Sequence, residues 1–314
     1  NIKTFTKQLQ ELGFDYDWSK MIATSDPEFY HWTQWIFKQL YKDGYAKYVD
    51  MPVNWCEELG TVLSNDEVID GKSERGGYPV VRKNMKQLCI DQAAFAERLL
   101  EGLNEIDWPE STKEMQRNWI GRSTGVEVQF EIVGGGKFSI FTTCIETIYG
   151  ITFMVLAPDG DLVQELMPRI KNQDEVKAYI QETVSKSEMD RTELNKGKTG
   201  CRLEGIKAIN PVNGREVEVF IGDFVLANYG TGAVMAVPSH DQRDFEYAIA
   251  HNIDRIQVIE GQDVSEHAFE KQDYLGKGCK LINSEEFTGL TVEEAKVAIT
   301  KKLVDMGIAK ETVN

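Results

Sequence analysis

Hydrophobic positions in the first part of the chain follow a helical period. Asp26-Pro27 is a favourable helix start, because aspartate caps a helix and proline fits its first position. Large apolar residues then recur three or four positions apart until Gly44 ends the run (Phe29, Trp32, Ile36 and Leu40). We expect this stripe to face a core rather than to form a binding face. Two further helices are predicted at residues 91–103 and 109–119.

From Gly125 onward the period of the hydrophobic pattern changes to two. Alternate residues from 126 to 132 are apolar, the glycines at 134–136 predict a turn, and residues 138–143 predict a returning strand. Asn213-Gly214 is a hairpin signal, and Thr291 with Glu294 forms a capping box. Further strands are expected at 151–157, 202–209, 216–221 and 223–228, and helices at 162–189, 240–251 and 292–306.

These elements predict an α/β (α+β) protein with two parts. Residues 123–308 are expected to form a β-rich domain with helices around it. Residues 1–122 are expected to form a mostly helical segment with a small hairpin insert near 46–82. Residues 309–314 are expected to be a linker that leaves the domain.

Composition narrows the class of protein. The chain has 314 residues, of which 41% are hydrophobic and 27% charged, as in ordinary soluble globular proteins. No apolar run is long enough for a membrane span and no signal peptide opens the sequence, so we expect no membrane partner. The five cysteines are scattered and never in a CxxC pair, which favours a reducing cytoplasm over a disulfide framework. Because the chain begins at Asn1, we interpret it as an excised fragment.

The formal net charge of −16 argues against an extended grip on nucleic acid, which normally requires a basic face. Two interpretations remain. Either the protein has no nucleic-acid partner, or its contact is confined to one end of the nucleic acid while other domains supply most of the affinity.

A first candidate for chemistry is the segment 141–150, Phe-Thr-Thr-Cys-Ile-Glu-Thr-Ile-Tyr-Gly. Three threonines and a carboxylate crowd the end of a predicted strand and the turn after it. Their hydroxyls and the backbone amides could bind a ribose, a carbonyl oxygen or a water. The structural alternative is that threonine simply favours strands.

A second candidate is the segment 229–244, in which a glycine turn leads through an apolar stretch to a helix start. Ser239 and Gln242 fit a capping box. Asp241 lies in the first turn, where the helix dipole favours an acid. Asp244 lies further in but shares a face with Asp241, so it needs another explanation. That explanation is either a surface salt bridge or a carboxylate that binds a cation at the rim of a pocket.

Other chemistries find little support. The four histidines form no recognisable arrangement with a serine or cysteine nucleophile, so we interpret His240 as structural. Cys56 stands without a second cysteine or histidine at ligand spacing, so we expect no metal. Phosphate loops of the Walker type are absent from the sequence, and we expect no cofactor.

Three stretches together resemble the bacterial type of leucyl-tRNA synthetase, and the likeness covers essentially the whole chain. Residues 12–19, 32–35 and 53–56 resemble the family's segment that enters its large insertion (connective peptide 1). Residues 116–123 resemble the tether into the editing domain, and residues 230–244 resemble the editing-site signature. The resemblance implies a barrel-like α/β editing domain that hydrolyses the ester of wrongly charged tRNA(Leu). Such a site is needed because one pocket rejects a similar aliphatic side chain by only about 1–3 kcal/mol.

The resemblance also implies roles for individual residues. Asp244 matches the aspartate that holds the α-ammonium of the attached amino acid, and Asp241 matches a neighbouring acid. Thr142 and Thr143 match threonines that line the adenosine and the hydrolytic water, so with Asp244 they are the expected catalytic residues. Thr147 matches the threonine whose bulk excludes leucine. The expected wall of the side-chain pocket is Tyr229, Met235 and Val237.

The chain also departs from the family pattern. Cys144-Ile145-Glu146 stands where the family commonly has Arg-Pro-Asp, which removes a positive charge near the tRNA end. The small module near 46–82 carries zinc ligands in some relatives, whereas here only Cys56 remains, so we interpret it as degenerate. The family's ATP-site motifs, of the His-x-x-His and Lys-Met-Ser-Lys types, are absent, which excludes aminoacylation by this chain alone.

The expected partners are the single-stranded 3′ end of tRNA(Leu) carrying a wrong amino acid and the remainder of the synthetase. A contact confined to that end would explain the acidic net charge. Two alternatives stay open. One is an isoleucyl or valyl editing domain, which the Gln242-Arg243-Asp244 ending disfavours. The other is a module that binds the tRNA end but has lost hydrolysis, which Cys144 favours.

Overall fold

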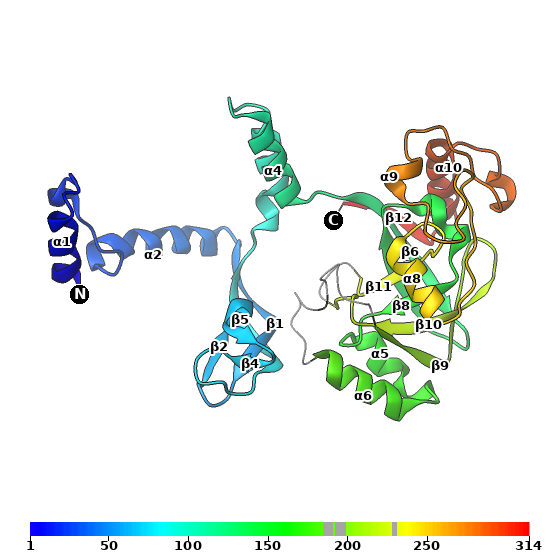
Figure 1. Cartoon of the computed structure of the whole chain (residues 1–314), viewed down its shortest axis with the longest axis horizontal. Helices are drawn as coiled ribbons and strands as arrows, with labels where there is room; N and C mark the ends of the chain where they lie inside the picture. The colour runs from blue at the N-terminus through cyan, green and yellow to red at the C-terminus, as the bar shows by residue number, and fades with distance from the viewer. Residues whose placement is uncertain (185–190, 192–198, 228–230, 314) are drawn as a thin grey trace. The chain divides into compact units, whose positions relative to one another are not determined.

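The computed structural model describes residues 1–184, 191, 199–227 and 231–313 (Figure 1). The chain divides into two compact units. The first contains residues 1–52 and 84–113, and the second contains residues 53–83 and 114–314. The helices and strands of the whole chain make a mixed α/β protein, as the sequence predicted. One large sheet lies in the second unit.

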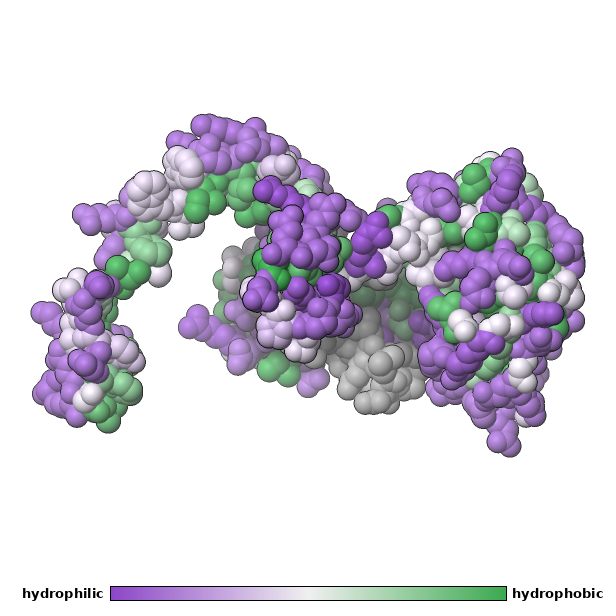
Figure 2. Space-filling view, turned by 90° about the horizontal axis from the view of Figure 1, so that it is seen from above, coloured by the Kyte–Doolittle hydropathy of each residue, from purple (hydrophilic) through white to green (hydrophobic). Residues whose placement is uncertain are grey.

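The first unit is mostly helical, with α1 (Ile2–Glu11), α2 (Pro27–Lys42) and α3 (Ala96–Gly102). The predicted start of α2 is confirmed, since Asp26 is its N-cap residue and Pro27 its first residue. The expectation that its aromatic stripe faces a core is wrong, because Trp32 is 60% and Ile36 54% exposed. Apolar side chains (green in Figure 2) lie on the surface of this helical segment. Helical spacing identifies an apolar face but not the partner that covers it.

A small β-rich region follows α2. Strands β1 (Ala46–Cys56), β2 (Thr61–Leu63) and β5 (Val81–Ile90) form a sheet in the order β2-β1-β5. Strands β3 (Val68–Ile69) and β4 (Lys72–Ser73) form a separate antiparallel pair. The segment expected to contain one small hairpin is therefore more elaborate. Helix α4 (Glu110–Ile120) follows, and Gly121 ends it at a φ of +68°.

A seven-stranded sheet organises the rest of the second unit. Its order is β11-β8-β10-β9-β6-β12, and β7 also pairs with β6. Only the β8–β10 pair is parallel among the printed pairs. Strands β7 and β11 contact each other, so the sheet curves. The strands are β6 (Thr124–Ile132), β7 (Lys137–Thr142), β8 (Phe153–Leu156), β9 (Gly200–Ile209), β10 (Glu216–Gly222), β11 (Ala233–Ala236) and β12 (Ala309–Val313).

The hydrophobic alternation explains why β6 forms. Val126, Val128, Phe130 and Ile132 are at most 3% exposed, whereas the residues between them are half-buried or exposed. This face belongs to the main hydrophobic core. The register pairs Val126 with Thr142, so the end of β7 lies beside the start of β6.

Helices surround the sheet (Figure 1). They are α5 (Asp161–Leu166), α6 (Gln173–Val184), α8 (Gln242–Ala250), α9 (Lys271–Tyr274) and α10 (Val292–Asp305). The capping box at the start of α10 is confirmed, because Thr291 and Glu294 make both of its hydrogen bonds. Residues 185–189, the end of the helix expected at 162–189, lie outside the described residues.

Two expectations differ from the structure near the end of the sheet. The strand expected at 223–228 does not form over residues 223–227, and residue 228 lies outside the described residues; a strand forms instead at 233–236. The guanidinium of the buried Arg191 donates to the carbonyl oxygens of Asp223 (2.8 Å) and Val225 (2.7 Å). These carbonyls are therefore satisfied without a neighbouring strand. Residues 309–313, which we expected to form a linker, pair with β6 as β12.

Candidate functional site

The threonine-rich segment forms a tightly bonded turn after β7. A 3-10 helix (Ile145–Gly150) follows, and all six of its residues are buried. Thr142 Oγ1 accepts a hydrogen bond from the Cys144 amide (3.0 Å), and Thr147 Oγ1 donates one to the Cys144 carbonyl (2.8 Å). Thr142 and Thr143 are half-buried, whereas Thr147 is 1% exposed. The hydroxyls of Thr142 and Thr147 therefore fix the turn itself.

Glu146 is a fully buried carboxyl group in this turn. Its Oε1 accepts a hydrogen bond from the Tyr274 hydroxyl (3.1 Å), and its Oε2 has no partner among the described residues. Burial raises the pKa of Glu146 above its ordinary value, while the positive charges of Lys296 and Lys271 act in the opposite direction.

The second candidate segment runs from β11 to the start of α8. β11 pairs with β8, and Met235 and Val237 are buried at 8% and 7% exposure. The backbone N–H of Val237 donates to Asp244 Oδ2 (2.9 Å). A side chain of α8 therefore holds the end of the apolar stretch in place.

Asp241, not Ser239, caps α8. Asp241 Oδ1 accepts a hydrogen bond from the Asp244 amide (3.0 Å). The predicted capping box of Ser239 and Gln242 is wrong, because the Ser239 hydroxyl is buried without a partner among the described residues. The cause is local geometry: the backbone of Asp241 is extended, and the helix begins only at Gln242.

Asp244 lies within the first turn of α8 rather than beyond it and is 1% exposed. Its Oδ1 accepts hydrogen bonds from Arg243 Nη2 (3.2 Å) and Nε (3.3 Å). Arg243 is 38% exposed, and its guanidinium also lies over the Phe224 ring. Burial raises the pKa of Asp244 above its ordinary value, the neighbouring Asp241 adds to this effect, and Arg243 opposes it. Asp244 is thus a buried carboxylate with one basic partner.

His240 has the environment of a structural residue. It is 5% exposed, its Nε2 accepts from the Val258 amide (3.0 Å), and its Nδ1 lies 3.1 Å from the Phe269 carbonyl, to which it donates. Burial lowers the pKa of His240 to about 4. The imidazole is therefore neutral near pH 7 with both nitrogens engaged, which does not suit a general base.

The predicted site residues fall into two groups. Thr142, Thr143 and Thr147 share one turn, while Asp241, Asp244 and Val237 are joined by hydrogen bonds. Strands β7 and β11, which lead into the two groups, contact each other. Tyr229 lies outside the described residues. Lys271 and Lys296, which no sequence pattern indicated, approach Thr143 from segments 128 and 153 residues away.

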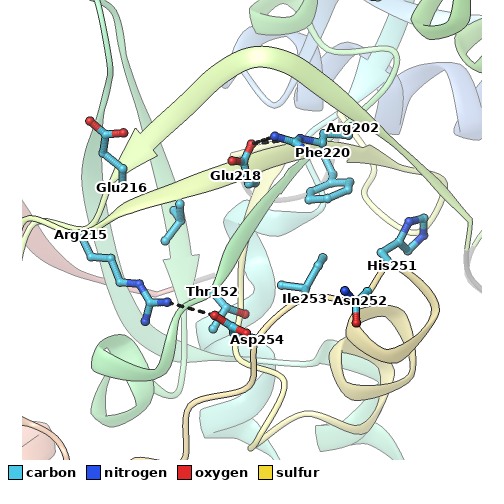
Figure 3. A pocket seen from close by; sticks show the side chains of 11 residues that line it. Thr152, Arg202, Arg215, Glu216, Glu218, Phe220, His251, Asn252, Ile253 and Asp254 are labelled. Carbon is cyan, nitrogen blue, oxygen red and sulfur yellow. Dashed lines mark hydrogen bonds and ion pairs between the residues drawn. The ribbon is translucent and has the colours of Figure 1, made fainter.

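A cavity of about 390 Å³ lies elsewhere in the second unit, against β9, β10 and the end of α8 (Figure 3). Two ion pairs lie at its wall, Arg202–Glu218 at 2.9 Å and Arg215–Asp254 at 3.8 Å. None of the predicted site residues lines this cavity.

The described residues meet the requirements of neither a metal site nor a membrane-spanning helix. In these residues, no cluster of three or more histidine, cysteine or acidic side chains could hold a metal ion. The buried Cys56 has Glu58 Oε2 at 3.9 Å from its sulfur. Over the same residues, no helix has the length and apolar character needed to cross a membrane.

Known proteins are similar to this chain in both sequence and fold. The family model described as leucyl-tRNA synthetase, editing domain, matches residues 117–304. The model of class I tRNA synthetases (I, L, M and V) matches residues 1–192. A solved ternary complex of Agrobacterium radiobacter K84 agnB2 leucyl-tRNA synthetase with tRNA and LeuAMS is similar, with a TM-score of 0.71 and 28% identity. The match covers 100% of this chain and 36% of that one. The chain belongs to the leucyl-tRNA synthetase family, and residues 117–304 match its editing domain.

Proposed function

We propose that this chain is the editing segment of a leucyl-tRNA synthetase and that it hydrolyses the ester of misacylated tRNA(Leu). The match of residues 117–304 to the editing domain of that family carries the proposal. In the reaction, a water oxygen bonds to the carbonyl carbon of the aminoacyl ester. The bond from that carbon to the ribose oxygen of the terminal adenosine breaks. The ribose oxygen takes a proton, and the products are a free amino acid and uncharged tRNA.

Asp244 is proposed to bind the α-ammonium of the attached amino acid. Its burial supports this role, because a carboxylate in a water-poor environment attracts a cation more strongly than one in water. A carboxylate has about four acceptor positions, and three contacts are made in this structure. Asp241, which caps α8 through the Asp244 amide, is proposed to fix the position of Asp244.

The turn after β7 is proposed to bind the other end of the ester. Thr142 and Thr143 would line the adenosine and the attacking water, and their half-buried positions leave them accessible. Thr147 would exclude leucine through its bulk, and its rigid bond to the Cys144 carbonyl suits a steric role. Met235 and Val237 would form the wall of the amino-acid pocket, together with Tyr229.

The proposed partners are the 3′ end of tRNA(Leu) and the rest of the synthetase. The similar structure is itself a complex of a leucyl-tRNA synthetase with tRNA. The net charge of −16 fits a contact with few phosphates, so the isolated chain should bind tRNA weakly. We also propose that the curved sheet is the barrel-like body of the editing domain, and that the region near 46–82 is a degenerate zinc module.

A second candidate function is binding of the tRNA end without hydrolysis, which Cys144-Ile145-Glu146 favours. The match to the leucyl editing domain disfavours an isoleucyl or valyl enzyme. The test is deacylation of isoleucyl-tRNA(Leu) by the synthetase that carries this segment. We expect hydrolysis well above the spontaneous rate. Binding of the charged tRNA without acceleration would leave only the second candidate.

A further inference from the structure

Two lysines from different helices converge on one residue of the threonine turn. Lys271, at the start of α9, places its Nζ 3.4 Å from Thr143 Oγ1. Lys296, on α10, donates from its Nζ to the Thr143 carbonyl oxygen at 2.9 Å. Both side chains are half-buried. Two ammonium groups thus contact the same residue, one at its hydroxyl and one at its carbonyl oxygen, although like charges repel each other.

Neither lysine has a carboxylate partner within 4 Å among the residues that the structure describes. The other half-buried lysines that the structure describes in the second unit do have one, since Lys207 lies 3.2 Å from Glu216 and Lys302 pairs with Glu286. Lysines without an ion pair among these residues, such as Lys177, are otherwise exposed. In a chain of net charge −16, acidic partners are abundant. Two unpaired, half-buried ammonium groups in such a chain are therefore unusual, and an anion from outside would relieve their repulsion.

Glu146 is the acidic group whose charge the two lysines influence, but it is not within ion-pair distance of either. Its Oε1 is bonded to Tyr274, and its carboxyl group is fully buried. Because burial favours the neutral acid, Glu146 compensates the two positive charges only partly. A purely internal charge balance does not account for both lysines.

Open space adjoins one of the two lysines, Lys296. A cavity of about 650 Å³ lies between the start of β6, α10 and β12, and Lys296 lines it with Gly125 and Val126. Val126 is the register partner of Thr142. The cavity therefore borders the residue of β6 that pairs with the end of β7, although neither Thr143 nor Lys271 lines it. Its volume accommodates a nucleotide.

We propose that Lys271 and Lys296 form a phosphate-binding subsite that takes the phosphodiester linking the terminal adenosine of the tRNA to the preceding nucleotide. The proposal rests on the proposed function, since it supplies the anion that the editing substrate carries next to its ester. Each ammonium has three N–H donors and uses one on Thr143, so donors remain for phosphate oxygens. Lysine binds phosphate as a point charge and needs no forked geometry. The two lysines are thus positioning residues, and they restore positive charge beside position 144, where the sequence has cysteine.

The test compares Lys271→Gln and Lys296→Gln with Lys207→Gln, a matched loss of one charge away from the turn, in the synthetase that carries this segment. Substrates are isoleucyl-tRNA(Leu) with a natural terminal phosphodiester and the same tRNA with a neutral methylphosphonate at that linkage. In the unmodified synthetase, the neutral linkage should lower kcat/KM about 10-fold, mainly through KM, as expected for losing a charge-assisted contact. Each turn variant should lose a similar factor on the natural tRNA and be much less sensitive to the neutral linkage. Lys207→Gln should behave as the unmodified protein, and Lys296→Arg should restore most of the activity.

Two results would overturn the proposal. One is that Lys271→Gln and Lys296→Gln remain as sensitive to the neutral linkage as the unmodified protein. The other is that they lower kcat equally on both substrates, which indicates that the lysines only brace the Thr143 carbonyl. If the unmodified synthetase does not hydrolyse the ester at all, the proposed function fails instead. Competition by tRNAs with an amide-linked amino acid and either linkage then tests the phosphate contact independently of hydrolysis.

Discussion

Replacing Asp244 tests the editing site most directly, because this residue has both a structural and a proposed chemical role. Asp244→Ala removes the acceptor of the buried Val237 N–H and the partner of Arg243. An unsatisfied buried N–H costs about 1–3 kcal/mol. Loss of the Arg243 contact adds little to this cost, because the Arg243 side chain is 38% exposed and still has Asp241 Oδ1 as an ion-pair partner, 3.7 Å from its Nε. Asp244→Ala should therefore destabilise the fold as well as remove the proposed contact with the substrate.

Asp244→Asn separates the two roles. Its amide oxygen can still accept from Val237, and the substitution removes the cost of burying a charge. We therefore expect the stability of Asp244→Asn to lie within about 1 kcal/mol of the unmodified protein. The negative charge that would hold the α-ammonium is lost, however. A charge-assisted hydrogen bond is worth about 1.5–3 kcal/mol, so kcat/KM for isoleucyl-tRNA(Leu) should fall about 10- to 150-fold.

The measurement pairs thermal unfolding of this chain with deacylation by the synthetase that carries it. Asp244→Ala should lower Tm by about 2–4 °C for each kcal/mol lost, whereas Asp244→Asn should not. Hydrolysis by the unmodified enzyme should increase with pH as Asp244 ionises. Because burial raises the pKa of Asp244, this increase should occur above the ordinary range of aspartate and should vanish in Asp244→Asn. Full activity of a folded Asp244→Asn variant would refute the anchoring role.

Three further predictions concern other residues. Thr147→Ala removes bulk rather than a catalytic group, so the enzyme should keep its activity on isoleucyl-tRNA(Leu) and gain hydrolysis of leucyl-tRNA(Leu). If a folded and active variant does not hydrolyse leucyl-tRNA(Leu) faster, Thr147 does not line the amino-acid pocket. His240 has a pKa lowered from 6.5 to about 4, so the unfolded chain binds more protons between these pH values. The neutral His240 side chain therefore contributes at most about 3 kcal/mol to the free energy of unfolding, a contribution that is present above pH 6.5 and is lost as pH falls towards 4. Denaturant unfolding of His240→Gln should show a flatter pH dependence in this range. Elemental analysis of chelator-free protein should find no stoichiometric zinc, since Cys56 has no second cysteine or histidine at ligand spacing.

Much of the sheet could be predicted where a strand buries only one of its faces, as β6 does. The alternation in β6 and the turn at Asn213-Gly214 both report that local constraint, and the register of β9 with β10 follows from the turn. The capping box of α10 is equally local, since its two residues are three positions apart. Patterns of this range can be read from the sequence without knowing what lies across the fold.

Features that depend on distant partners could not be predicted in this way. The apolar run at 223–228 has strand composition, but Arg191 takes its carbonyl groups instead of a neighbouring strand. The stripe on α2 has core composition, but nothing in its spacing says what covers it. Lys271 and Lys296 carry no local pattern at all, because their relation to Thr143 arises only when α9 and α10 pack beside the turn.

The two buried carboxyl groups of the candidate site have different surroundings, and this difference supports a different proposed role for each. Asp244 accepts hydrogen bonds from a backbone amide and a guanidinium, both of which stabilise the ionised form. Glu146 is just as buried, but Tyr274 is the one other residue among those described that donates a hydrogen bond to its carboxyl group, and its second oxygen has no partner among them. A buried acid without a basic partner in contact favours the neutral form. Asp244 is therefore suited to hold a substrate cation. Glu146 is suited to support the turn, which explains why the chain tolerates a glutamate without an ion pair at this position.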